Sequence, residues 1–170
     1  MLIGGQAVLL HGRPRLTEDI DITLAADPTR LADVLEVCAA LRLQTLPEDI
    51  ESFVRQTFVV PALHEQTSIR VDFIFSTTPY EREAIDRAVV VQLAGESVPF
   101  AAAEDLIIHK LFAGRSTDLE DAATVVRRKG GELDWAYLER WVREFASVPG
   151  RADLPHLLGD LRRQLDEQED

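Results

Sequence analysis

Apolar residues follow two different spacings along the chain, and the change comes near Ala102. Before it, short runs rich in Val, Ile and Phe are typical of strands, and they cover 19–24, 57–63, 68–76 and 88–93. After it, apolar positions recur at helical spacing in 103–114, 117–131, 133–146 and from about Leu154. The pattern predicts an α+β (mixed α/β) fold, in which a small mixed sheet flanked by helices over 1–100 precedes a C-terminal helical segment over 101–170.

Local signals predict where several of these elements begin and how two of them pair. Asp27 followed by Pro28 is typical of a helix start, and we expect this helix to extend to about Leu43. The four residues HEQT between the second and third strands favour an antiparallel hairpin. Capping patterns of the form T-x-x-E predict two more helix starts, at Thr78 with Glu81 and at Thr117 with Glu120.

The composition is that of a globular domain with a core of its own. The chain has 170 residues, of which 46% are hydrophobic, and its single cysteine, Cys38, lies on the apolar side of a helical pattern, where it is expected to fill the core. Apolar runs are all shorter than the roughly 20 residues that span a bilayer, and the opening residues lack the pattern of a signal peptide. We therefore expect a cytoplasmic protein without a membrane partner.

The acidic balance of the chain narrows the choice of partners. A net charge of −12 and a pI near 4.7 disfavour a general binder of polyanions, which needs a basic surface to neutralise several phosphates. A cationic or neutral partner is easier to accommodate, although a local basic patch could still hold RNA.

Two glycines and two aspartates lie close together near the start of the chain. Asp19 and Asp21 are two apart in a predicted strand, so their carboxylates point to the same face and repel each other unless a cation lies between them. Oxygen ligands of this kind suit Mg²⁺. Gly4 and Gly5 join a strand stub to a helix start, where bare N–H groups favour an anion. A nucleoside triphosphate with a bound metal ion would suit both features, because the aspartates favour the metal and the glycine pair favours the phosphates.

A third carboxylate, Asp72, interrupts the apolar strand IRVDFIF. It could complete a site with two metal ions and help to activate an attacking hydroxyl. The alternative is that Asp72 forms an ion pair with Arg70 or Arg15, and that the other two aspartates lie on a solvated strand face.

Several motifs in a fixed order resemble the nucleotidyltransferase superfamily with the polymerase β-like catalytic fold, in particular its AbiEii-type toxin branch. The motifs are GG-x-A, R-x-T-x-D-I-D, V-D-F, E-D-L-I-I-H-K-L-x-A-x-R and D-L-x-D, and they extend from Gly4 to about Val126. The resemblance implies an enzyme that transfers a nucleoside monophosphate from a triphosphate to an acceptor hydroxyl, with two divalent ions, Mg²⁺ or Mn²⁺.

The resemblance also implies roles for individual residues. The catalytic and metal-binding residues would be Asp19, Asp21 and Asp72, and the nucleotide-binding residues would be Gly4, Gly5, Arg15, Thr17, Lys110 and Asp118. Asp121 matches the same acidic motif as Asp118. The core over 1–100 would then be the catalytic domain, and the helices of 101–170 would complete the nucleotide site. Arg15 could equally form a structural ion pair, and Asp118 could serve as an acid at a helix N-terminus.

Three functions remain open from the sequence. The first is a toxin of a toxin–antitoxin pair, with an antitoxin protein as partner and a nucleic-acid end such as that of tRNA, or a protein hydroxyl, as acceptor. The second is a small-molecule nucleotidyltransferase of the aminoglycoside-modifying type, since two bound Mg²⁺ would still leave a formal charge of about −8, which attracts a cationic acceptor. The third is a member that binds a nucleotide or a partner without turnover.

The start of the sequence departs from the family pattern. Members commonly carry a helix before the first strand, whereas this sequence opens inside that strand. We therefore expect either that the true start lies upstream or that the exposed sheet face is covered by the C-terminal helices or by another subunit in a homo-oligomer.

Overall fold

The computed structural model describes residues 1–169, which form two compact units. Unit 1 comprises Met1–Gln6 and Leu16–Ala101, and unit 2 comprises Ala7–Arg15 and the chain from Ala102 onward. The chain passes between the units within helix α1 (Gly4–His11), after Arg15 and after Ala101. The functional division into 1–100 and 101–170 stays a prediction.

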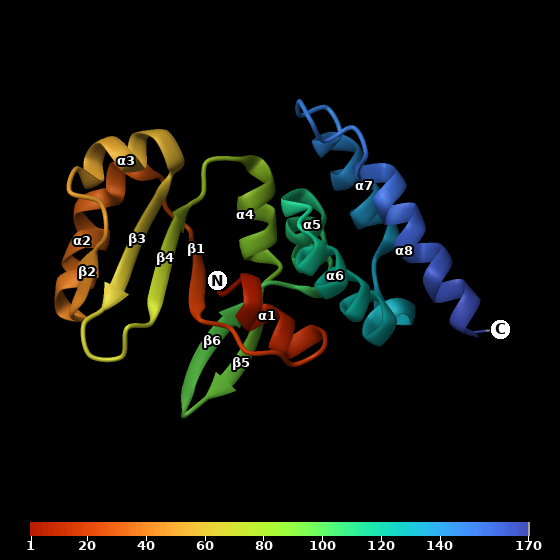
Figure 1. Cartoon of the computed structure of the whole chain (residues 1–170), viewed down its shortest axis with the longest axis horizontal. Coiled ribbons are helices and arrows are strands. Elements are labelled where there is room, and N and C mark those ends of the chain that lie inside the picture. Colours follow the sequence, from red (N-terminus) through yellow and green to blue (C-terminus); the bar gives the residue numbers. More distant parts are fainter. Residues whose placement is uncertain (170) are drawn as a thin grey trace. The chain divides into compact units, whose positions relative to one another are not determined.

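A four-stranded mixed sheet is the centre of unit 1, with strand order β1-β4-β3-β2 (Figure 1). Strands β1 (Asp19–Leu24) and β4 (Arg70–Phe75) are parallel, and β3 (Val59–His64) pairs antiparallel with β4. The predicted hairpin and the predicted mixed sheet are therefore confirmed. Strand β2 (Leu43–Thr45) pairs antiparallel with β3.

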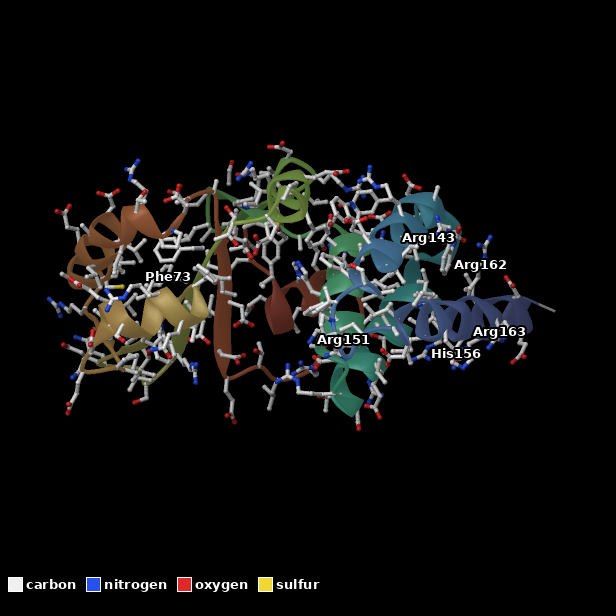
Figure 2. All side chains as sticks on the ribbon, turned by 90° about the horizontal axis from the view of Figure 1, so that it is seen from above. Phe73, Arg143, Arg151, His156, Arg162 and Arg163 are labelled. Carbon is white, nitrogen blue, oxygen red and sulfur yellow. The ribbon has the colours of Figure 1, made fainter. Side chains whose placement is uncertain are left out.

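Successive side chains along each strand point to opposite faces of this sheet, and one of the two faces is buried in the core. Along β4, Val71, Phe73 and Phe75 are buried, whereas the residues between them are more exposed. Helices α2 (Leu31–Ala40) and α3 (Ile50–Thr57) contribute Val34, Cys38 and Val54 to the same core, and Figure 2 shows Phe73 beside them. Cys38 is 2% exposed, so its predicted place in the core is confirmed.

The predicted helix from Asp27 to about Leu43 is wrong in extent. Asp27 does cap a 3₁₀ turn, η1 (Pro28–Arg30), which leads into α2, but α2 ends at Ala40. Arg42 has a φ of 55°, which a helix does not tolerate, and the following residues pair with β3 instead. A strand that the sequence did not predict thus replaces the end of the helix.

The rest of unit 1 is a helix and a separate two-stranded sheet. Helix α4 (Pro79–Asp86) begins with the predicted capping box, in which Thr78 and Glu81 satisfy each other's backbone N–H groups. Strand β5 (Val89–Leu93) pairs antiparallel with β6 (Glu96–Phe100), and β6 was not predicted. Near the start of the chain, Leu2 forms only isolated bridges, to Ile22 and Phe100.

Unit 2 is helical over the described residues. Besides part of α1 it contains α5 (Ala103–Ala113), α6 (Ser116–Lys129), the 3₁₀ turn η2 (Gly130–Glu132), α7 (Trp135–Phe145) and α8 (Leu154–Glu169), as Figure 1 shows. The side chains of Leu106, Leu111, Val125 and Leu138 are fully buried. No helix within residues 1–169 is both long and apolar enough to cross a membrane.

The predicted cap of the helix after Thr117 is wrong. Helix α6 begins one residue earlier, at Ser116, and the residue at its N-cap, Arg115, makes no side-chain capping bond. Thr117 therefore lies inside the first turn. The nearby Asp118 is held by ion pairs with basic side chains, which fixes this end of the helix in another way.

Candidate functional site

The parallel pair β1–β4 places three aspartates on one face of the sheet in unit 1. Asp21 lies opposite Asp72 in the register of the two strands, and Asp19 lies opposite Arg70. Because side chains two apart on a strand share a face, all four of these side chains project from the side away from the Phe73 core. We call the three carboxylates Asp19, Asp21 and Asp72 the acidic face.

Gly4 lies directly against the acidic face. Its φ is +58°, and a Cβ built on it would lie 2.0 Å from Oδ2 of Asp21. A side chain at this position would thus meet both backbone strain and a clash with a carboxylate. The start of α1 therefore lies directly against the acidic face, and binding of phosphate by the glycine pair stays a prediction.

The second glycine makes room for the loop that leads into β1. A Cβ on Gly5 would lie 2.5 Å from Oγ1 of Thr17. That hydroxyl donates a hydrogen bond to Oδ1 of Asp19 at 2.9 Å and another to the Asp19 carbonyl oxygen at 3.0 Å. Thr17 therefore orients a carboxylate of the acidic face, and its binding of nucleotide stays a prediction.

Asp72 is held by Arg70, one of the two partners considered from the sequence. Nε of Arg70 donates to Oδ1 of Asp72 at 2.8 Å, and its NH2 nitrogen donates to Oδ2 at 3.0 Å. These hydrogen bonds outweigh the effect of burial and raise the pKa of Arg70, and the charges of Asp72, Asp19 and Asp21 act in the same direction. The Arg70 side chain is 50% exposed, and that of Asp72 is 17% exposed.

The donor set of the acidic face fits a hard divalent cation in its chemistry, since it consists of carboxylate oxygens. Among residues 1–169, however, no three acidic, histidine or cysteine side chains are already gathered around one metal position. The reason at Asp72 is visible, because both of its oxygens accept from Arg70.

Unit 2 contains a second group of carboxylates, which we call the ion network. Lys110 on α5 lies 2.8 Å from Oδ1 of Asp118 and 2.9 Å from Oδ2 of Asp121, both on α6. The side chains are almost fully buried, at 7% exposed for Lys110 and 2% for Asp118. Arg115 pairs with Asp118, and Arg15 pairs with Asp121 at 2.9 Å, so the network has three cations around two carboxylates.

The basic groups of the ion network keep both aspartates ionised. Burial alone would raise the pKa of each carboxyl, but the opposing interactions are stronger. Hydrogen bonds and charge from Arg115 and Lys110 lower the pKa of Asp118, and those from Arg15 and Lys110 lower the pKa of Asp121. Arg15 thus forms the structural ion pair that the sequence left open, with Asp121 rather than Asp72.

The predicted site residues therefore fall into two groups. Unit 1 brings together Gly4, Gly5, Thr17, Asp19, Asp21 and Asp72, and unit 2 brings together Arg15, Lys110, Asp118 and Asp121. Sequence reasoning missed the pairing of Arg115 with Asp118, although their i, i+3 spacing is a usual signal for such a pair.

The whole described chain matches one protein family. Residues 1–169 match the family described as "Nucleotidyl transferase AbiEii toxin, Type IV TA system". The chain belongs to the AbiEii nucleotidyltransferase toxin family. The resemblance drawn from the motifs is confirmed by this match, and so is the prediction of a nucleotidyltransferase enzyme.

Solved structures of other proteins have a similar fold. A lincosamide antibiotic adenylyltransferase, LnuA, in its lincomycin-bound crystal structure, is 15% identical, with a TM-score of 0.50 over 73% of this chain and 83% of that chain. An antigenic nucleotidyltransferase-like protein from Paracoccidioides brasiliensis is 13% identical, with a TM-score of 0.56 over 99% of this chain and 81% of that chain. At these identities the likeness shows the fold alone. Comparison with curated proteins gives no significant match.

Proposed function

We propose that this AbiEii-family enzyme transfers a nucleoside monophosphate from a nucleoside triphosphate to an acceptor hydroxyl, with Mg²⁺ or Mn²⁺ bound at the acidic face. The observation that carries the proposal is the parallel register of β1 and β4, which sets Asp21 beside Asp72 with Asp19 on the same face. Three like charges on one face of a sheet destabilise each other unless a cation binds there, and a structural role would not require the arrangement.

In this proposal the residues of the acidic face have different roles. Asp19, Asp21 and Asp72 would hold the divalent ion, which would neutralise charge on the triphosphate when it is bound. Asp72 accepts the proton of the acceptor hydroxyl, whose oxygen then attacks the α-phosphorus as pyrophosphate leaves. Thr17 keeps the Asp19 carboxylate oriented through its 2.9 Å hydrogen bond.

In this proposal Gly4 and Gly5 help to bind the triphosphate. The first N–H groups of α1 have no partner within the helix, and the helix dipole favours an anion at this end. Gly4 and Gly5 carry no side chain that would keep phosphate oxygens away from these N–H groups. Binding of nucleotide by Arg15, Lys110 and Asp118 stays a prediction, because the contacts observed for these residues lie within the ion network.

The acceptor class follows from the family in the first instance. Membership in a type IV toxin family favours a toxin that is paired with an antitoxin and that acts on tRNA or a protein hydroxyl. One observation favours a second candidate, a small cationic molecule such as an aminoglycoside. Unit 1, which carries the acidic face, has six Lys and Arg residues against fifteen Asp and Glu residues, so its field attracts cations and repels a polyanion.

A transfer assay with labelled nucleotides tests the function and sorts the acceptors. The protein is incubated with each α-labelled triphosphate, with Mg²⁺ or Mn²⁺, and with separate pools of tRNA, cellular protein and aminoglycosides. We expect label in one pool, at a rate that Asp72→Asn lowers strongly. Label in no pool with any of the four triphosphates would contradict the proposal and favour a family member that binds without turnover.

A further inference from the structure

Arg70 lies on β4 beside the three carboxylates of the acidic face and carries the opposite charge. It lies opposite Asp19 in the strand register and two residues before Asp72, so its side chain leaves the same face as all three carboxylates. Its guanidinium contacts Asp72 through two hydrogen bonds. Arg70 is thus a cation that lies on the acidic face and is paired with Asp72.

We propose that Arg70 is a displaceable counter-ion that holds Asp72 in the metal-free enzyme and competes with the divalent cation for that carboxylate. The inference rests on the proposed function and concerns the regulation of the same site. Both oxygens of Asp72 accept hydrogen bonds from Arg70, so this carboxylate can serve the reaction only after Arg70 has released it. Binding of the cation and the separation of Arg70 from Asp72 are then thermodynamically coupled, so each favours the other.

The exposure of Arg70 makes the exchange feasible. Half of its side chain is exposed, and it stands at the first position of β4, where the side chain can turn into solvent. An ion pair of this kind contributes little to stability, because solvent screens it. A divalent ion carries twice the charge of the guanidinium and is a strong competitor for the same oxygens.

The surroundings of Arg70 argue against a purely structural role. Removal of its head group opens no cavity, because the guanidinium lies at the solvated end of the strand pair. Lys110 in unit 2 shows what a structural cation looks like in this chain, since its ammonium group is buried between two carboxylates. The Arg70 contact is open to solvent, as a contact that must be broken in each cycle requires.

Competition of this kind has a consequence for binding affinity. A variant that lacks the Arg70 charge should bind a divalent cation more tightly, because the cation no longer has to displace a resident group. The same variant should be less stable than the wild type in EDTA, because Asp72 then loses the arginine with which it is paired. A residue that merely supports the fold would lower stability without tightening the metal affinity.

The test measures Mn²⁺ binding by titration calorimetry and by the electron paramagnetic resonance signal of free Mn²⁺, with no nucleotide present. We expect Arg70→Gln to lower the Kd for Mn²⁺ about fivefold, which corresponds to the strength of a half-exposed pair. Arg70→Lys, which keeps the charge but loses the two-point contact, should give a smaller decrease. In thermal melts, the gain in Tm between EDTA and saturating Mn²⁺ should be larger for Arg70→Gln than for the wild type.

Two controls separate the possible failures. Arg55→Gln removes the same charge from an exposed arginine of unit 1, whose pair with Glu51 spans 3.7 Å, and should leave the Kd unchanged. Asp19→Asn should abolish high-affinity Mn²⁺ binding. If Asp19→Asn does so but Arg70→Gln binds no more tightly than Arg55→Gln, the counter-ion proposal is wrong and the proposed metal site stands. If Asp19→Asn binds Mn²⁺ as the wild type does, the proposed metal site is wrong, and the counter-ion proposal is overturned with it.

Discussion

The two units of this enzyme place carboxylates beside basic side chains in opposite ways. On the acidic face of unit 1, three aspartates share one half-exposed arginine. In the ion network of unit 2, two aspartates share a buried lysine and two arginines. Aspartates outnumber the arginine in the first group, whereas in the second three cations surround two carboxylates.

This difference in charge and exposure points to different roles for the two groups. A buried pair with balanced charges holds two helices together and is costly to open, so the ion network fixes α5 against α6. An exposed group with surplus charge contributes little to folding and is free to exchange its cation. We therefore propose the acidic face as the site of catalysis and the ion network as a contact that stabilises unit 2.

Loss of the buried lysine should have the largest effect on folding. Lys110→Met leaves Asp118 and Asp121 buried with less compensation, and we expect the free energy of unfolding to fall by about 3 kcal/mol, as for other broken buried pairs. Lys129→Met is the matched control, because the pair of Lys129 with Glu132 is more exposed. Urea denaturation measures both. The contrast between the two units would be wrong if Lys110→Met lowered the free energy of unfolding no more than the control and also abolished binding of the triphosphate. Lys110 would then be a residue that binds the nucleotide.

Acid should weaken unit 2 through the same network. Hydrogen bonds and charge from basic neighbours lower the pKa of Asp118 and Asp121 in the folded state, so their contribution is complete above the unfolded value of about 3.9. Stability should fall as the pH drops below about 4 and through the lowered folded-state values. Denaturant unfolding at a series of pH values measures the slope. Lys110→Met should show a shallower slope than the wild type, and an equal slope would locate the acid sensitivity elsewhere.

A side chain at Gly4 should have an intermediate effect. Gly4→Ala combines a φ of +58° with a Cβ 2.0 Å from the Asp21 carboxylate, and we expect a loss of about 1–3 kcal/mol in the free energy of unfolding. Gly95→Ala shares the positive φ but meets no atom within 4 Å, so it measures the backbone term alone. Thermal melts of both variants give the difference. Equal losses would mean that the clash with Asp21 is relieved at no cost.

Neutralising the acidic face should have the smallest effect on folding. Asp19→Asn removes one of three neighbouring like charges and keeps an oxygen that can accept from Thr17, so the free energy of unfolding should change by less than about 0.5 kcal/mol. Any gain should shrink in high salt, which screens the repulsion. A loss as large as that of Lys110→Met would make Asp19 a structural residue and would remove the contrast between the two groups.

Local periodicity was enough to predict the central strands and their chemistry. The alternation in 19–24 and 68–76 predicted β1 and β4, and the two-residue period predicted that Asp19 and Asp21 share a face. The elements that were missed depend on pairing. Strand β2 has only three residues and is defined by its contacts with β3, and β6 contains Pro99 and polar residues that carry little strand signal.

The partners of the charged residues were less predictable than their positions. Arg70 and Asp72 are two apart on one strand, so their pairing was open to a sequence argument. The pairing of Lys110 with both Asp118 and Asp121 requires α5 and α6 to pack at one angle and register, and the pairing of Arg15 with Asp121 spans 106 residues. No local rule of sequence supplies such contacts.

The initial rate of nucleotidyl transfer by Asp21→Asn tests the central claim most directly. With an α-labelled triphosphate, Mn²⁺ and the acceptor pool that the wild-type enzyme labels, the variant keeps the size of the side chain and should melt within about 1 °C of the wild type, but it should transfer label at least about a hundredfold more slowly. Transfer at the wild-type rate by this folded variant would contradict the assignment of the acidic face as the reaction centre.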